Sequence, residues 1–390
     1  MENVAVIFGG KSVEHEVSII TGMQIMENMD KSMYRPIPIY ITKDGKMLSG
    51  ESLLDFKTFK SKDFSKAKEV FFKAVNNSHN LFTVELKKGG LFAKETLGIE
   101  KVCNIDVIFP ALHGTYGEDG CVQGIFECMD IPYVGCGVMS AAVGMDKVVM
   151  KKVFQSFNIP MTEYFYFYRN EWNNQEEIIE KSEKIGYPLF VKPANLGSSV
   201  GISKAEDREG LVEAINIACH YDRKIIVEQA VVNPREINAA VLGYEDDILV
   251  SECEEPTGWK DFLSYEDKYL GDGKTKGTGM KNQKKNLPAD IPESVKNEIQ
   301  HYAKLAFRAI DGMGNARVDF LLDGEKVYVN EINTLPGSIA FYLWEASGIS
   351  FEKLINKLID LAKVRYRQKS ENIYSIDSGL LDKTTFGAKL

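Results

Sequence analysis

A short, wholly apolar run followed by two glycines is the feature that most constrains the fold. Val4 to Phe8 contains no polar residue, and Gly9-Gly10 follows at once. The run does not alternate, so it is typical of a strand that is buried on both faces and ends in a tight turn. Apolar residues at helical spacing follow within 12–29, and Ile37 to Ile41 is a second strand candidate. Strand, turn, helix and strand predict an α/β domain with a parallel sheet.

Another buried strand indicates where this sheet would bind a ligand. Val107 to Phe109 runs directly into the polar, glycine-rich segment 110–120, which is followed by a predicted helix over 120–129. In open α/β sheets, ligands bind at the carboxyl ends of the strands. The intervening residues 43–100 are rich in lysine and less periodic, and we expect several short strands there.

The rest of the chain mixes short strands with helices. The predicted elements are helices over 139–157, 293–310 and 351–366 and strands over 187–192, 224–228, 237–242 and 248–251. The segment 256–287 is different, because it is rich in Gly and Lys and offers little material for a core. A length of 390 residues favours two or three domains. We expect three, over 1–137, 138–231 and 232–366, followed by a tail over 367–390.

Composition excludes several classes of protein. Hydrophobic residues make up 44% and charged residues 26%, as in ordinary globular proteins. The net charge of −9 argues against a general nucleic-acid binder. The longest uncharged stretch, 131–145, is too short to span a membrane, so we expect no membrane insertion. No basic segment precedes the first apolar run, and the six cysteines form no CxxC motif, so a reduced, cytoplasmic protein is expected.

A predicted hairpin around Asp323-Gly324 carries the most informative side chains. Asp319 lies on its first strand, and Glu331 and Asn333 lie on its second strand, where alternation puts them on one face. These oxygen ligands suit Mg²⁺, which leaves coordination positions for water and phosphates. Arg317 shares the face of Asp319, and a cation there suits a developing negative charge. The alternative is a hairpin with a merely solvated acidic face.

Lysines at the ends of predicted elements indicate a triphosphate site. Lys147, Lys192 and Lys268 accompany the flexible, hydroxyl-bearing loop 197–201. Backbone N–H groups and hydroxyls hold phosphate oxygens, and ammonium groups offset their charge. Glu228, at the end of a strand, has the chemistry to accept a hydrogen bond from an exocyclic amine. Taken singly, each of these residues is more often a solvated surface side chain.

Seven segments together carry a family resemblance. They are Phe8–Ser18, His113–Gly120 with Gln123-Gly124, Met145–Lys147, Val191–Pro193 with Gly197–Gly201, Tyr265–Tyr269, Arg317–Asp319 and Asn330–Gly337. In this order, over about residues 4–365, they resemble the D-alanine–D-alanine ligase family of the ATP-grasp superfamily. The resemblance implies an ATP-grasp fold with an N-terminal Rossmann-like domain. It also implies an ATP-dependent ligase that joins two D-alanines for peptidoglycan synthesis, and a homodimer.

The resemblance further implies a binding site for ATP and metal. The expected phosphate contacts are Lys147, Lys192, Ser198, Ser199 and Lys268. The expected contacts of adenine and ribose are Glu228, the backbone of Gln229, Ala230 and Val231, and Glu236. Two Mg²⁺ ions, or Mn²⁺ in their place, are expected on Asp319, Glu331 and Asn333.

For the substrates, the resemblance implies an acyl-phosphate mechanism. ATP phosphorylates the first D-alanine, and the amine of the second then displaces phosphate. Glu16 is expected to hold the first ammonium group, and Tyr269, on a lid over 256–287, to bond Ser198 and Glu16. Arg317 and the Gly337 backbone are expected to stabilise the developing charge, and His113 to lie near the second substrate. A closed lid would exclude the water that hydrolyses an acyl phosphate.

One run departs from the family pattern. The family has Thr two positions and Ser five positions after the glycine of Pro-Gly, where this chain has Ile339 and Tyr342. Because that serine helps to hold the carboxylate of the second substrate, Tyr342 predicts an altered acceptor pocket. The alternative function is therefore a D-alanine ligase with another acceptor, such as D-serine. Tyr269 favours a dipeptide over an ester product.

Two other classes fit less well. A nicotinamide oxidoreductase would use the strand Val4 to Phe8, but no GxGxxG follows it. A non-catalytic nucleotide-binding relative would not need the intact set of Arg317, Asp319, Glu331 and Asn333.

Overall fold

The first strand, β1 (Glu2–Gly9), lies between two parallel neighbours, as its apolar run predicted. These neighbours are β2 (Tyr34–Ile41) and β7 (Val107–Pro110). The structure is a computed structural model, and it describes residues 1–73, 79–87, 96–256 and 285–380. Alternate side chains of β1 enter two cores. Val4, Val6 and Phe8 pack with α1 (His15–Asn28), and the residues between them pack with α3 (Cys121–Met129). A strand with helices on both faces must be apolar throughout, which explains the run.

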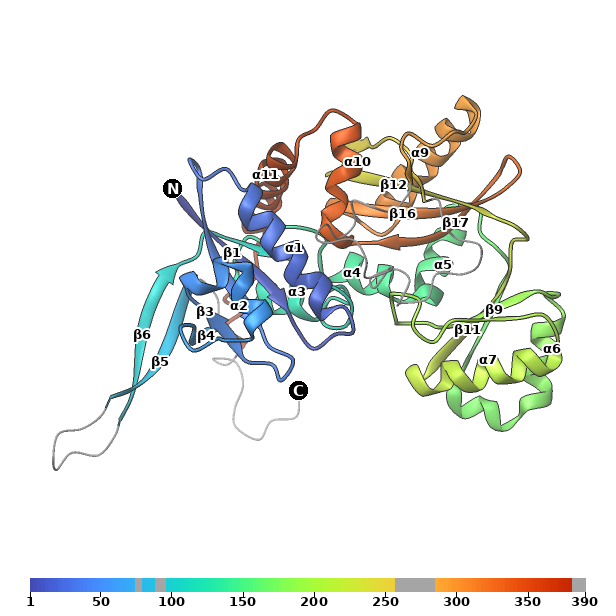
Figure 1. Cartoon of the computed structure of the whole chain (residues 1–390), viewed down its shortest axis with the longest axis horizontal. Helices are drawn as coiled ribbons and strands as arrows, with labels where there is room; N and C mark the ends of the chain where they lie inside the picture. Colours follow the sequence, from blue (N-terminus) through green and yellow to red (C-terminus); the bar gives the residue numbers. More distant parts are fainter. Residues whose placement is uncertain (74–78, 88–95, 257–284, 381–390) are drawn as a thin grey trace.

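Four short strands extend this sheet with antiparallel pairing, as expected for residues 43–100. The strand order is β6-β5-β4-β3-β2-β1-β7. The hairpin of the last two added strands projects from the body of the molecule (Figure 1). The added elements are β3 (Met47–Ser49), η1 (Glu51–Leu54), α2 (Phe56–Ser61), β4 (Lys68–Phe72), β5 (Asn80–Lys87) and β6 (Thr96–Asn104).

The prediction of a single helix over 139–157 is wrong in one respect. The structure divides it into α4 (Val138–Met145) and α5 (Lys147–Ser156). Asp146 lies between them in an extended conformation, and its carboxylate accepts hydrogen bonds from the backbone N–H groups of Val148 and Val149. Asp146 is thus the N-cap of a new helix. Lys147 consequently stands in the first turn of α5 rather than in the middle of a longer helix.

A second, four-stranded sheet has the order β10-β9-β11-β8. One face is covered by α6 and α7, and the other face receives α5 (Figure 1). The strands predicted over 187–192 and 224–228 are its two central members, which are antiparallel. Its elements are β8 (Tyr164–Tyr168), η2 (Arg169–Asn173), α6 (Gln175–Glu183), β9 (Leu189–Pro193), β10 (Ser203–Ala205), α7 (Arg208–Tyr221) and β11 (Lys224–Gln229).

A third sheet has the order β13-β12-β16-β17 and contains the predicted hairpin. On one face, apolar residues pack against α9. The residues between them point to the other face, because side chains alternate along a strand. The elements of this part are β12 (Arg235–Tyr244), β13 (Asp247–Val250), β14 (Glu255–Pro256), β15 (Lys285–Asn286), α9 (Glu293–Ala309), β16 (Gly314–Asp323), β17 (Lys326–Asn333), η3 (Gly337–Ala340) and α10 (Phe341–Ala346).

The last helix, α11 (Phe351–Ser370), is longer than predicted. It packs against the first sheet, in one core with β1 and α1, so the C-terminal part of the chain returns to the N-terminal part. Arg365 donates to the carbonyls of Tyr133 and Gly135, each at 3.1 Å, and Lys369 pairs with Glu127. These contacts hold the last turns of the helix, of which residues 367–370 belong to the segment predicted as a tail.

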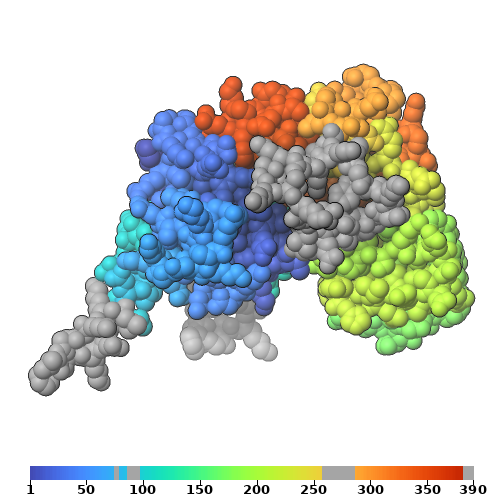
Figure 2. Space-filling model, viewed as in Figure 1, coloured from blue at the N-terminus to red at the C-terminus, as the bar shows by residue number. Residues whose placement is uncertain are grey.

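The three sheet-containing parts lie side by side (Figure 2), with the blue N-terminal part and the yellow-green second sheet on either side of the molecule. Orange and red elements of the third part run between them along the top. None of the helices in the described ranges is long and apolar enough to cross a membrane. The division at 137 and 231 stays a prediction.

Candidate active site

One cleft gathers residues from all three parts of the chain. Most of the site residues predicted from the sequence line it, although they come from positions as far apart as 113 and 342. These are His113, Lys147, Lys192, Ser198, Ser199, Glu236, Arg317, Asp319, Glu331, Asn333, Gly337 and Tyr342. Lys268 and Tyr269, together with most of the lid predicted over 256–287, lie in 257–284, outside the described residues.

The hairpin side chains form one wall of the cleft. Asp319 is the direct backbone partner of Glu331, and Arg317 is the partner of Asn333. All four side chains therefore share the face that turns away from α9. Arg317 binds Asp319 with two hydrogen bonds, of 2.6 and 2.7 Å, and the Asn333 amide donates to Asp319 at 3.0 Å. The predicted clustering of these four side chains is confirmed.

The same hairpin contributes Asn330, which lies in a segment that carried the family resemblance but was given no role. The register shifts between Asp319 and Phe320, so that Asn330 is an extra residue on β17. Such a bulge turns two successive side chains toward the same side of a strand. Asn330 and Glu331 both line the cleft, and the Asn330 amide oxygen accepts from Lys192 at 3.5 Å.

Two lysines lie near this wall and come from the second sheet and its neighbouring helix. Lys147, in the first turn of α5, lies 3.4 Å from the Glu331 carboxylate and donates to the Leu196 carbonyl at 3.0 Å. Lys192, near the end of β9, lies 2.5 Å from the Glu228 carboxylate. Both lysines are largely buried, so their positive charges are concentrated inside the cleft.

Glu228 lies behind Lys192 and does not line the cleft itself. Its other oxygen lies 3.1 Å from Lys151, a fully buried lysine of α5. Burial alone would raise the pKa of Glu228, but the charges of Lys151 and Lys192 outweigh it and lower that pKa to about 2. Glu228 is therefore ionised and fixes the position of Lys192.

Part of the backbone predicted to contact adenine already makes hydrogen bonds within the protein. The N–H of Gln229 donates to Glu163 at 2.9 Å, and the N–H of Ala230 donates to Pro188 at 3.0 Å. Val231 is half-buried at the end of the strand that carries Glu228. The nucleotide contact of this segment stays a prediction.

Glu14, two residues before the predicted Glu16, lies beside Ser198 in the cleft. The Ser198 hydroxyl donates to the Glu14 carboxylate, and Glu14 lines the cleft. Glu16 is exposed and is not among the lining residues. The reason is local, because α1 begins at His15 and its first turn directs Glu16 away from the cleft. Gly114 leaves the room for Glu14, since a Cβ there would lie 2.7 Å from that carboxylate.

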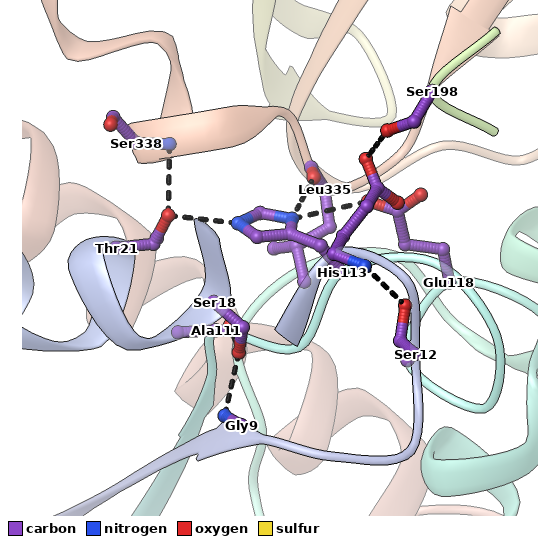
Figure 3. Close-up of polar contacts among 12 residues, drawn as sticks. Gly9, Ser12, Ser18, Thr21, Ala111, His113, Glu118, Ser198, Leu335 and Ser338 are labelled. Atoms are coloured by element: carbon purple, nitrogen blue, oxygen red, sulfur yellow. Dashed lines mark hydrogen bonds and ion pairs between the residues drawn. The ribbon is translucent and has the colours of Figure 1, made fainter. Parts of the chain in front are cut away.

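His113 lies at the junction between the first sheet and the hairpin part (Figure 3). Its Nδ1 is 3.0 Å from the Leu335 carbonyl and 3.3 Å from the Glu118 carboxylate, and its Nε2 is 2.8 Å from the Thr21 hydroxyl. Burial opposes the charge on the ring, but hydrogen bonding and charge from Glu118 outweigh it and raise the pKa of His113. Burial, reinforced by the negative charge of Glu14, raises the pKa of Glu118 to about 7.

Tyr342 lines the cleft, as does Arg317. Its hydroxyl donates to Glu254 at 2.9 Å, and Glu254 is 1% exposed. Burial and the negative charge of Glu254 raise the pKa of Tyr342, which keeps the phenol protonated. Ile339, at the second departure from the family pattern, is buried in the core and does not line the cleft.

Several residues that line the cleft are not among the site residues predicted from the sequence. Glu14 and Glu118 lie inside segments that carried the family resemblance, so a signal for them existed. Asn238 and Glu254 also line the cleft, but each is an isolated polar residue in its segment, and nothing local marks it. No group of three or more His, Cys, Asp or Glu side chains in the described ranges could hold a metal, so a metal site here depends on Asn333.

Comparison with known proteins agrees with this geometry. The family models of the D-ala D-ala ligase N-terminus and C-terminus match residues 3–136 and 153–360. A D-alanine–D-alanine ligase from Thermosipho africanus is 41% identical over 383 residues, 98% of this chain and 99% of that one.

Solved structures add two similar proteins. The VanG D-Ala:D-Ser ligase of Enterococcus faecalis has a TM-score of 0.76 and 31% identity, with 93% of this chain and 99% of that one covered. The D-alanine–D-alanine ligase of Coxiella burnetii has a TM-score of 0.73 and 29% identity, with 95% and 96% covered. The chain thus belongs to the D-alanine–D-alanine ligase family.

Proposed function

We propose that this protein is an ATP-dependent ligase that joins two D-alanine molecules and releases ADP and phosphate. One observation carries the proposal: the acidic wall of Asp319 and Glu331, the lysines and the Glu14–Ser198 pair meet in a single cleft. The first two sets suit a nucleotide, and the third suits an amino acid. The named relatives support this choice of substrates. The product is a building block of peptidoglycan, and the ATP requirement fits a cytoplasmic enzyme. A homodimer stays a prediction from the family resemblance.

The wall of the cleft fits a magnesium site by the chemistry of its donors. Asp319 and Glu331 offer carboxylate oxygens from directly opposite backbone positions, and the amide oxygen of Asn333 lies two residues further along. Mg²⁺ binds through one or two carboxylates and keeps positions for phosphate oxygens and water. We assign two ions to these three residues. When bound, they would offset the charge of the triphosphate.

The phosphates are assigned to the cationic side of the cleft. Lys147 and Lys192 are held in place by acids, and Ser198 and Ser199 both have left-handed backbone conformations, with φ of 55° and 58°. The backbone N–H groups of such a turn can bind an anion. Glu236 is assigned to the ribose and the segment 229–231 to adenine, while the buried Glu228 holds Lys192 in place.

Glu14 is assigned to the first D-alanine. Its carboxylate, fixed by Ser198, binds the ammonium group and directs the substrate carboxylate toward the γ-phosphate. Attack by that carboxylate gives an acyl phosphate and ADP. The amine of the second D-alanine then attacks the acyl carbon, the C–O bond to phosphate breaks, and the amine loses a proton. Arg317 and Gly337 line the cleft, and the oxyanion of this step is assigned to the Arg317 guanidinium and the Gly337 N–H.

Tyr342 supports a second candidate function, that of a D-alanine ligase with another acceptor such as D-serine. The family's serine is short, whereas Tyr342 has a long side chain that lines the cleft and whose hydroxyl is bonded to Glu254. The structurally similar VanG protein is a D-Ala:D-Ser ligase. D-Alanine remains the preferred acceptor because named relatives that are 41% and 44% identical are D-alanine–D-alanine ligases.

A panel assay tests the proposal. The protein is supplied with ATP, Mg²⁺ and D-alanine, either alone or with D-serine or D-lactate, while phosphate release is followed and products are identified by mass spectrometry. We expect D-alanyl-D-alanine with stoichiometric ADP. Product only in the presence of D-serine would select the second candidate, and no ADP with any donor would refute both.

A further inference from the structure

A strained turn directly follows Gly337. Ser338, Ile339 and Ala340 have φ of 52°, 47° and 51°, which is the left-handed region that L-residues avoid. For a β-branched residue such as Ile339 this conformation is especially unfavourable. Strained backbone persists only where its surroundings hold it, and it concentrates at functional sites.

A chain of polar contacts connects the residues on either side of Pro336-Gly337 (Figure 3). The N–H of Ser338 donates to the Thr21 hydroxyl at 3.1 Å, and that hydroxyl lies 2.8 Å from His113 Nε2. The opposite ring nitrogen, Nδ1, lies 3.0 Å from the carbonyl of Leu335. The contacts thus run from Ser338 through Thr21 and His113 back to Leu335, and enclose the two residues between.

The chemistry of the groups sets the direction of these bonds. The carbonyl of Leu335 can only accept, so His113 Nδ1 carries a proton. In the neutral ring, Nε2 then accepts from the Thr21 hydroxyl, whose oxygen still accepts from Ser338. If the ring is protonated, Nε2–H donates to the same oxygen, which has two acceptor sites. Thr21 therefore completes the chain in either state of the histidine.

A second support holds the same turn from the other side. The Asn315 amide donates to the carbonyl of Ile339 at 2.8 Å, and its oxygen accepts from the Trp344 indole at 2.8 Å. Thr21, Asn315 and Trp344 are all buried, so water does not substitute for these bonds. Of the two supports, Thr21 is the one that joins the turn to the helix that follows Glu14.

We infer that Thr21 is a positioning residue, which acts through Ser338 and His113 to set the Gly337 N–H against the reacting carbonyl. The inference depends on the proposed role of Gly337 in the ligase reaction. Loss of the hydroxyl releases one side of the strained turn and shifts Gly337, while the lysines that bind ATP stay in place. A misplacement of about 1 Å at a reacting centre lowers the rate by up to about 100-fold.

Three substitutions test this role. Thr21→Val keeps the shape of the side chain and removes the hydroxyl, and Thr21→Ser keeps the hydroxyl. Thr83→Val is the matched control, because Thr83 is also buried and donates to a backbone carbonyl, that of Glu69, but lies outside the cleft. For each variant, kcat, the KM values for ATP and D-alanine, and the thermal midpoint are measured.

We expect Thr21→Val to lower kcat roughly tenfold or more with the KM for ATP within about twofold of the parent. Thr21→Ser restores kcat, and Thr83→Val leaves it unchanged. A folded Thr21→Val with parental kcat would overturn the inference, as would a Thr21→Ser variant that is equally slow. Thr21→Ala, which puts no methyl group against the imidazole, replaces Thr21→Val if the latter does not fold.

Two further outcomes complete the test. If neither hydroxyl-free variant folds, Thr21 has only a structural role and the inference fails. If the parent protein makes no dipeptide, the proposed function has failed instead, and the two failures are thereby distinguished.

Discussion

Asp319 and Glu331 lie directly opposite each other on β16 and β17, with both side chains on the face that lines the cleft. Like charges in directly opposed positions destabilise a sheet unless cations offset them. Arg317 binds the first carboxylate and Lys147 lies near the second, so the wall already attracts positive charge. The backbone pairing of the hairpin fixes the spacing of the two carboxylates before any ligand binds.

The metal assignment predicts a large effect at Glu331. Glu331→Gln keeps the size of the side chain and removes the charge, so we expect turnover to fall by about 100-fold or more through lost metal binding. Phosphate release is measured against Mg²⁺ concentration. Glu325→Gln, an exposed position on the turn of the same hairpin, is the control. Near-normal turnover of Glu331→Gln at low Mg²⁺ would show that the metal has been misplaced.

The position of Glu14 predicts a contrast between two neighbouring acids. We expect Glu14→Gln to raise the KM for D-alanine about tenfold or more, because a hydrogen bond between charged groups contributes about 1.5–3 kcal/mol. Glu16→Gln is expected to behave as the parent, because Glu16 is exposed. Initial rates over a range of D-alanine concentrations give the KM of each variant. The reverse pattern would restore the original assignment to Glu16.

The contrast shows where sequence reasoning reached its limit. The buried β1 run and the hairpin at Asp323-Gly324 could be predicted, because periodicity and turn residues are local signals. Which of two acids around His15 faces the cleft depends on where α1 begins, and spacing does not determine that. The helix break at Asp146 is due to an N-cap residue that lies within a continuous apolar pattern, so the pattern alone does not reveal it. Contacts such as Tyr342 with Glu254 are long-range and leave no local trace.

The lowered pKa of Glu228 predicts a pH-dependent stability. The folded pKa of about 2 lies below the ordinary value of 4.5, so the stabilising contribution is present above pH 4.5 and is lost as the pH falls toward 2. At pH 7, Glu228→Gln should cost about 3 kcal/mol, since it leaves Lys151 and Lys192 buried without their partner. Denaturant unfolding at several pH values should show this cost shrinking below pH 4.5. A cost that does not change with pH would contradict the assignment.

Tyr342 predicts a selective effect on the acceptor. Tyr342→Phe removes the hydrogen bond to Glu254, and we expect the KM for the second D-alanine to rise about tenfold while the KM for ATP stays unchanged. Because the pKa of Tyr342 is raised, the same factor is expected at pH 7 and at pH 9.5. Tyr328→Phe, on β17 but outside the cleft, is the control. A change confined to the KM for ATP would place Tyr342 elsewhere in the reaction.

We expect this cleft to activate a carboxylate by phosphorylating it. Supplying D-alanine labelled with ¹⁸O in its carboxylate, together with ATP and Mg²⁺, tests this directly. The acyl-phosphate route transfers one carboxylate oxygen to the phosphate that leaves, so mass spectrometry should find inorganic phosphate carrying one ¹⁸O beside D-alanyl-D-alanine. Dipeptide formed with unlabelled phosphate would contradict the account.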